Sequence, residues 1–133
     1  MKKLTLLLLL MVSTSVTAEY KCSIKEIKQL DDNGLVNKDN WTKLQDRYFD
    51  TLIWNDNTRL LRFIDKNGEE TCCTRLFDVI QSGTSENSTI AIHIFKGPSS
   101  TFVSYFRLET FRKGQPFLLT IDSEILSGNC KRV

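Results

Sequence analysis

The stretch that decides the fold class of this chain is residues 101–130, TFVSYFRLETFRKGQPFLLTIDSEILSGNC. Successive side chains of a β-strand point to opposite faces, so an alternation of apolar and polar residues predicts a strand with one face toward a core. The first half of the stretch has this alternation: Phe102, Ser104, Phe106 and Leu108 fall on one side, and Val103, Tyr105, Arg107 and Glu109 on the other.

The break in this pattern, RKGQP at residues 112–116, contains the Gly and Pro that are typical of turns. A second alternating run follows it, with Phe117, Leu119, Ile121, Ser123 and Ile125 on one face and Leu118, Thr120, Asp122, Glu124 and Leu126 on the other. The stretch therefore predicts a hairpin of two strands that are longer than average.

The rest of the chain repeats the theme of short apolar runs separated by polar turns. Strand patterns cover residues 20–30, 49–54, 60–64, 71–81 and 89–95, and DDNG, NDNT and DKNG mark turns between some of them. Helical spacing occurs only at residues 39–48. We expect an all-β, antiparallel meander, closed into a small barrel of about eight strands with one short helix.

Residues 1–18 have the three parts of a secretory signal peptide. Lys2 and Lys3 give a positive start, residues 4–12 an apolar run, and Ala18 ends a small-residue cleavage site. The apolar run is too short for a membrane anchor, which needs roughly 20 residues. We therefore expect residues 19–133 to be a single β-domain in the periplasm or outside the cell, with no membrane insertion after cleavage.

The charge balance argues against two classes of partner. The whole chain has 18 basic and 16 acidic residues, and removing Lys2 and Lys3 with the leader leaves 16 of each. Nucleic acids and anionic membranes select for a basic excess. We expect neither as the main partner.

The four cysteines, Cys22, Cys72, Cys73 and Cys130, all follow the leader. An exported chain meets oxidising conditions, so disulfides are expected, and four cysteines allow three pairings. We favour Cys22 with Cys130, because the first and last strands of a closed meander are neighbours. Adjacent cysteines rarely meet disulfide geometry, so the state of Cys72 and Cys73 stays open. One histidine and no CxxC pair disfavour a metal site.

No catalytic set is recognisable. His93 is the only histidine, and no feature brings a nucleophile beside it, so we interpret it as a surface or rim residue. Asp122 and Glu124 are explained by strand alternation, although a hydrolase using two carboxylates stays conceivable. No glycine-rich phosphate loop is present, and no cofactor is expected. Tyr105 and Phe111 share the polar face of their strand, which makes them possible surface contacts.

Tyr20-Lys21-Cys22 near the start of the exported part and Ser127-Gly128-Asn129-Cys130 near its end resemble small exported β-barrel proteins of proteobacteria. One group of these comprises periplasmic inhibitors of c-type lysozyme. That group carries a Ser-Gly-x-x-Tyr loop. This chain lacks the loop, since neither Ser82-Gly83 nor Ser127-Gly128 has a tyrosine three residues after its glycine. The resemblance implies an exported barrel and assigns no inhibitory residue.

We expect a non-enzymatic binding protein of the periplasm or medium, with another protein as its target, of the inhibitor or immunity type. The alternative is a calycin-like carrier of a small apolar ligand, which requires a cavity inside the barrel. A core filled by Phe102, Phe106, Phe117 and Ile121 would count against the carrier. The target and the oligomeric state do not follow from the sequence.

Overall fold

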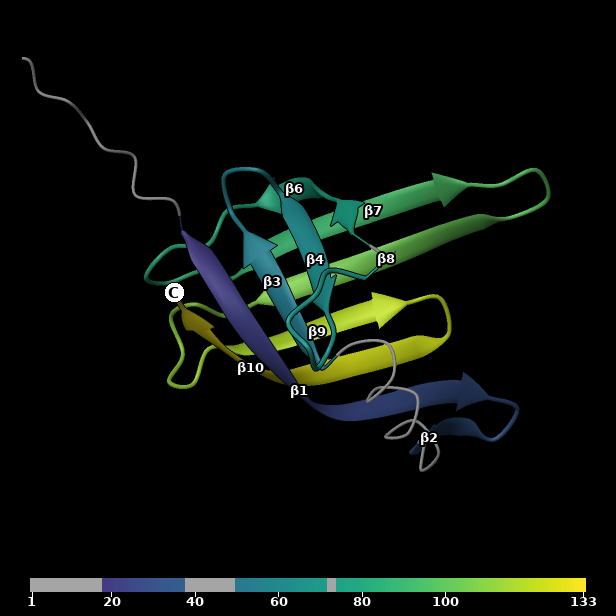
Figure 1. Ribbon diagram of the computed structural model, residues 1–133. Helices are drawn as coiled ribbons and strands as arrows, with labels where there is room; N and C mark the ends of the chain where they lie inside the picture. The colour runs from purple at the N-terminus through teal and green to yellow at the C-terminus, as the bar shows by residue number, and fades with distance from the viewer. Residues whose placement is uncertain (1–17, 38–49, 72–73) are drawn as a thin grey trace, which may run out of the picture.

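The structure is a computed structural model that describes residues 18–37, 50–71 and 74–133. Within these residues it contains ten strands and no helix (Figure 1). The strands are β1 Glu19–Asp31, β2 Gly34–Asn37, β3 Thr51–Asn55, β4 Leu60–Ile64, β5 Arg75–Leu76, β6 Asp78–Gln81, β7 Thr89–Lys96, β8 Thr101–Leu108, β9 Pro116–Ile121 and β10 Glu124–Arg132. The predicted all-β class is confirmed. The predicted helix at residues 39–48 lies outside the described residues.

The strands form one antiparallel sheet in the order β5-β4-β3-β1-β10-β9-β8-β7-β6, with β2 paired to β1. The first strand therefore lies between β3 and the last strand, β10. The ladder does not close, so the predicted barrel is not confirmed: β5 and β6 are the two edges of the main path. Phe77 alone separates these edges in the chain, so residues 75–81 run from one edge of the sheet to the other.

The Cys22–Cys130 disulfide is present, as predicted. The two cysteines lie directly opposite each other in the β1–β10 ladder, with 3.9 Å between their Cα atoms. The bond joins positions 108 residues apart, and both side chains are buried. Cys72 and Cys73 lie outside the described residues.

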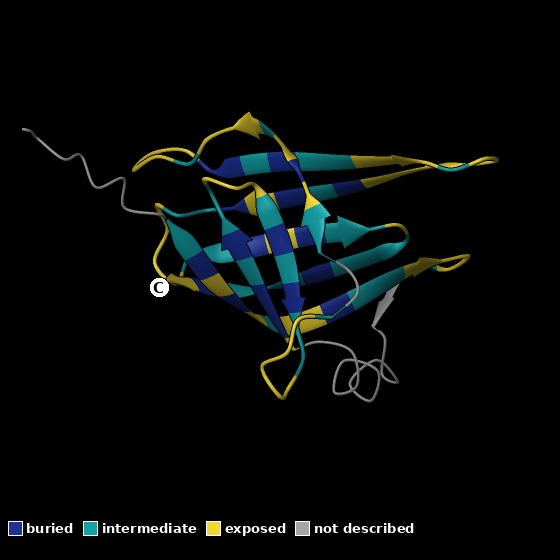
Figure 2. Cartoon of the chain, turned by 45° about the horizontal axis from the view of Figure 1, so that its top comes forward, coloured by how far each residue is buried: buried dark blue, intermediate teal, exposed yellow. Residues whose placement is uncertain are grey.

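The sheet folds over and encloses its core with one face (Figure 2). Trp54 of β3 packs against Phe106 of β8, with 5.0 Å between ring centroids, although β1, β10 and β9 separate these strands in the sheet. Phe77 meets Trp54 edge to face at 6.1 Å. Contacts between strands so far apart in the ladder require a strongly curved sheet.

The stretch that predicted the fold contains three strands rather than two. Phe106, Leu108, Phe117 and Leu119 are buried as expected. The second predicted strand is interrupted at Asp122, which has a positive φ of 54° and begins a two-residue turn between β9 and β10. Asp is one of the few residues that tolerate this conformation. The turn reverses the chain, so Leu126 faces the core opposite Leu119, and the predicted inward position of Ile125 is wrong.

Candidate functional site

The feature that stands apart from the rest of the fold is the end of the β7–β8 hairpin, residues 93–104, which we call the arm. The ladder between β6 and β7 ends at Ile92, and the ladder between β8 and β9 begins at Tyr105. Beyond these rungs β7 and β8 pair only with each other, and within the described part of the chain no strand flanks them (Figure 1). The arm is therefore a two-stranded ribbon that extends past the sheet.

The inner face of the arm continues the face that lines the core. On this face of the hairpin, Ala91 pairs with Phe106 in the sheet, and His93 with Ser104 and Phe95 with Phe102 in the arm. The Ala91–Phe106 rung is fully buried, whereas Phe95 and Phe102 are 56% and 41% exposed. Their rings stack at 6.4 Å and 26° between planes. A core-type aromatic pair thus stands in solvent at the end of the hairpin.

The outer face of the arm is apolar as well. Ile94 pairs with Val103, and both are 49% exposed. The next rung toward the sheet pairs Ile92 with the half-buried Tyr105. Tyr105, one of the two predicted surface contacts, therefore adjoins the apolar outer face of the arm. Cross-strand neighbours of this kind lie within contact distance, so these side chains form one strip.

A hollow of about 460 Å³ lies at the base of the arm. Phe95 and Phe102 supply its aromatic wall, and Ile121 adds an aliphatic one. Four polar residues complete the lining: His93 and Ser104 belong to the arm, Arg75 to β5, and Asp122 to the β9–β10 turn. The hollow therefore combines apolar walls with a few polar groups, which is the usual composition of a ligand site.

Two hydrogen bonds organise the polar side of the hollow. Arg75 lies on the edge strand β5, and its Nη1 donates to Ser104 Oγ at 2.8 Å. His93 Nδ1 lies 2.8 Å from the carbonyl oxygen of Leu76. A carbonyl can only accept, so Nδ1 is the donor in this contact. The His93 ring also packs against Phe77, 5.8 Å away.

Phe111, the other predicted surface contact, is exposed but lies in the β8–β9 connection, at the opposite end of β8 from the arm. In the same connection Arg112 Nη1 donates to Glu109 Oε2 at 2.7 Å, and Arg107 pairs with Oε1 at 2.8 Å. The hydrogen bond and charge of Arg112, followed by those of Arg107, lower the pKa of Glu109. The structure does not bring Phe111 and Tyr105 into one site.

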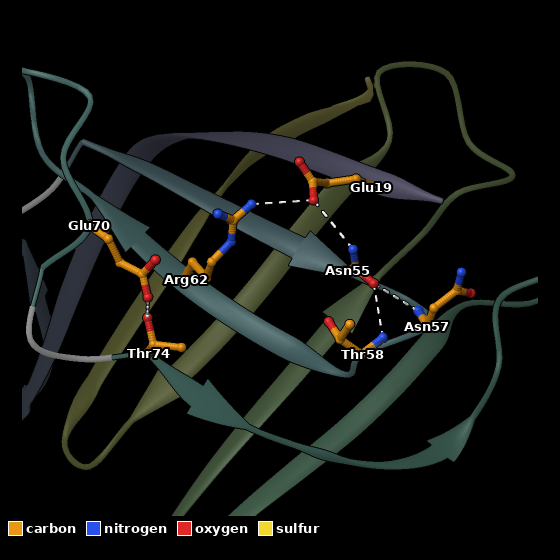
Figure 3. Close-up of polar contacts among 7 residues, drawn as sticks. All are labelled: Glu19, Asn55, Asn57, Thr58, Arg62, Glu70 and Thr74. Carbon is orange, nitrogen blue, oxygen red and sulfur yellow. Dashed lines mark hydrogen bonds and ion pairs between the residues drawn. The ribbon is translucent and has the colours of Figure 1, made fainter. Parts of the chain in front are cut away.

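A second group of polar contacts lies on β1, β3 and β4, and Figure 3 shows that its members bind one another. Glu19 Oε2 accepts hydrogen bonds from Asn55 and Arg62, each at 3.3 Å. Asn55 Oδ1 in turn accepts from the backbone of Asn57 and Thr58, which organises the β3–β4 turn. These groups are satisfied by structural contacts, so this cluster is a poorer candidate than the hollow.

One carboxylate of the buried region has a perturbed pKa. Burial raises the pKa of Asp56 above its ordinary value, and the hydrogen bond from Trp54 Nε1 and the charge of Arg132 oppose this rise only in part. Asp56 lies at the β3–β4 turn rather than in the hollow. Because Asp56 accepts a hydrogen bond from the indole of the buried Trp54, its ionisation can be followed through the fluorescence of Trp54.

Within the described ranges, no three metal-binding side chains gather in one place. The same residues contain no helix long and apolar enough to cross a membrane.

The sequence indicated His93 as a rim residue but did not reveal the hollow. Arg75 comes from a segment whose short strands and bend at Phe77 have no clear signature. One usable signal was present: in residues 92–95 both sides of the alternation are apolar apart from His93. Such a two-sided pattern is unusual for a strand that faces water on one side.

Comparisons of the chain with protein-family models, with curated proteins and with solved structures found no match. The resemblance to exported barrel proteins and lysozyme inhibitors therefore stays a prediction, and no family is assigned to this chain.

Proposed function

We propose that this chain is an exported, non-enzymatic binding protein that holds another protein through the β7–β8 arm. The observation that carries the proposal is the exposure of apolar side chains on both faces of the same two rungs, Ile94–Val103 and Phe95–Phe102. A two-stranded ribbon is at best marginally stable alone in water. Contiguous exposed apolar surface of this kind marks interaction sites in soluble proteins.

The arm has the chemistry that protein interfaces favour. The centres of such interfaces are enriched in aromatic and aliphatic side chains and depleted of charge. From His93 to Phe95 and from Phe102 to Ser104 the arm carries no Asp, Glu, Lys or Arg. No described strand pairs with its outer backbone edges beyond Ile92 and Tyr105, so a partner strand could add to the ribbon by main-chain hydrogen bonds.

The disulfide and the predicted leader support the exported location in this proposal. A buried disulfide between Cys22 and Cys130 is typical of proteins that fold in the periplasm or outside the cell. The leader at residues 1–18 has the pattern that would take the chain there. An inhibitor or immunity protein can bind its target through an element that protrudes from a rigid scaffold. Here the Cys22–Cys130 disulfide would make the scaffold rigid, and the arm would be the protruding element.

The calycin-like carrier is the second candidate, and the filled core counts against its usual form. Phe106 and Phe117 pack inside, together with Trp54, where a carrier would hold its ligand. Phe102, however, is exposed and lines the hollow at the base of the arm, and Ile121 lines the same hollow while it packs against the edge of the core. Any small ligand would therefore bind at this mouth rather than in the interior.

The experiment compares two exposed apolar rungs of equal kind. The arm variant carries Ile94→Ser and Val103→Ser, and the matched control carries Leu30→Ser and Leu35→Ser on the β1–β2 hairpin, where the two leucines pair and are 57% and 53% exposed. Oxidised parent and both variants serve as bait for periplasmic and extracellular proteins of the producing cell. Retained proteins are identified by mass spectrometry, purified and titrated.

We expect one protein that binds the parent and the control with equal affinity and loses at least tenfold in affinity for the arm variant, because truncating interface anchors has effects of this size. Equal binding to all three proteins would contradict the arm as the interface. If no purified protein binds the parent specifically, the protein-binding function is wrong.

A further inference from the structure

The hollow at the base of the arm contains an arginine that forms no ion pair with any carboxylate in the described part of the chain. Arg75 uses Nη1 for the hydrogen bond to Ser104, and no carboxylate of a described residue forms an ion pair with it. A guanidinium has five N–H donors in a planar fork. Among the described residues only Ser104 accepts a hydrogen bond from the Arg75 side chain, so several of its donors are left for a ligand.

The surroundings strengthen any interaction that Arg75 makes. Its strand neighbours Leu61, opposite it on β4, and Phe77, two residues on, are fully buried, and the side chain itself is half-buried at the rim of the core. Close to low-dielectric walls a charge is screened less than on an open surface. An uncompensated cation in such a place favours an anionic partner.

The shape of the anion follows from the donor geometry and the walls. The guanidinium fork matches the two oxygens of a carboxylate, which it can bind bidentately. The stacked rings of Phe95 and Phe102 and the side chain of Ile121 offer apolar surface to whatever the carboxylate is attached to. The volume of about 460 Å³ falls within the range of small-molecule sites.

Among the described residues that line the hollow, Asp122 is the acidic one. It lies in the exposed β9–β10 turn and makes no ion pair with Arg75. Solvent screens much of its charge. Its repulsion would weaken a bound anion and direct the carboxylate to the Arg75 side, and His93, whose ring is held by Leu76 and Phe77, completes that side.

We propose that the hollow is a binding site for a small carboxylate with an apolar, aromatic body, whose carboxylate Arg75 binds and whose body packs on Phe95 and Phe102. This site goes beyond the proposed protein partner, because it requires no second protein. It also differs from the carrier alternative in its place, at the mouth, and in the charge of its ligand.

The test uses 3-phenylpropionate and its uncharged counterpart 3-phenylpropan-1-ol as probes. Both are titrated into the oxidised protein and followed by amide chemical shifts. We expect the carboxylate to bind at least tenfold more tightly than the alcohol, since hydrogen bonds to charged groups are about this strong. The shifted amides should cluster around Phe102 and Ser104. Equal binding of the two probes, or shifts elsewhere in the sheet, would overturn the proposal.

Four variants test whether the effect belongs to Arg75. We expect Arg75→Gln to lose at least tenfold in affinity for the carboxylate, and Arg75→Lys, which keeps the charge but not the fork, to lose less. Arg112→Gln removes the same charge at the far end of β8 and should bind like the parent. Asp122→Asn should bind the probe more tightly. Unchanged affinity in Arg75→Gln, or weaker binding by Asp122→Asn, would disprove a carboxylate site.

Discussion

Phe106 and Phe102 lie four residues apart on the same face of β8, yet one is fully buried and the other is 41% exposed. Phe106 is covered by Trp54, by Phe77 at 6.3 Å and by Phe117 at 6.4 Å. Phe102 has a ring contact only with Phe95 among the described residues. Lying on the inner face of a strand is therefore not enough to bury a side chain. Burial also requires that other strands pack over that part of the face.

The cover ends because the opposing strands are shorter than the hairpin. β3 and β4 have five residues each, whereas β7 and β8 have eight. At about 3.3 Å per residue, the extra length of the hairpin amounts to about 10 Å. The comparison shows that apolar inner-face residues of β7 and β8 belong to the core where other strands pack over them. Where these strands end, the same apolar alternation continues and forms the exposed arm.

The largest expected effect comes from removing the disulfide that joins β1 to β10 in the covered part of the sheet. Replacing Cys22 and Cys130 together by Ala should lower the free energy of unfolding by roughly 4 to 5 kcal/mol, because the bond closes a very long loop in the unfolded chain. Urea denaturation of the oxidised proteins measures the difference. The parent under reducing conditions should resemble the variant, and equal stability of variant and oxidised parent would contradict the prediction.

The two phenylalanines test the comparison directly. Phe106→Ala should cost about 3 to 5 kcal/mol, since it leaves a cavity among Trp54, Phe77 and Phe117. Phe102→Ala should cost about 1 kcal/mol or less, because its ring already contacts water. Urea denaturation of both variants provides the measurement. Similar losses would show that the arm is as well covered as the core.

A matched pair of glycines extends the contrast to the backbone. A Cβ at Gly128 of β10 would lie 2.0 Å from the Ser23 carbonyl oxygen, whereas one at Gly97, in the arm turn, would lie 3.3 Å from the nearest atom. Gly128→Ala should therefore cost about 1 to 3 kcal/mol, because the strands must move apart. Gly97→Ala should have a much smaller effect. Thermal denaturation compares the two, and a larger loss at Gly97 would contradict the expectation.

The smallest predicted effect concerns the pH dependence of the core. Burial raises the pKa of Asp56 in the folded state, so its ionised form opposes folding, and this opposition is relieved as the pH falls through that pKa. Asp56→Asn should thus gain stability over the parent as the pH rises from about 4 to 7.

Trp54 fluorescence during urea denaturation measures this difference, since the indole donates to Asp56. A stability difference that does not change with pH would contradict the raised pKa. Asp32→Asn, which replaces an exposed aspartate in the β1–β2 turn and leaves Asp56 untouched, serves as the control at each pH.

Local patterns predicted the parts of this fold that depend on local chemistry. Alternation placed Phe106, Leu108, Phe117 and Leu119 on the core side, and the ends of the chain suggested Cys22 with Cys130. The turn at Asp122 was missed because Asp fits a strand face and a tight turn equally well. Once that turn was missed, the positions after it were assigned to the wrong face.

The candidate site could not be predicted because it depends on distant strands. Arg75 meets Ser104 only because the sheet folds until its edge strand β5 reaches β8. The exposure of Phe95 and Phe102 depends on where β3 and β4 end, which no residue of the arm encodes. The alternation of apolar and polar residues predicted which side chains share a face of each strand, but it could not predict which strands pack against that face.

The placement of the disulfide has a mechanical consequence. Glu19 and Val133 lie side by side, and the backbone N–H of Val133 donates to the carbonyl of Glu19. A force that pulls these two residues apart would extend only the few residues outside Cys22 and Cys130 before the covalent bond carried the load. The arm would then stay in place under tension, so the proposed binding of a partner to the arm would be compatible with tethering of the chain by both ends.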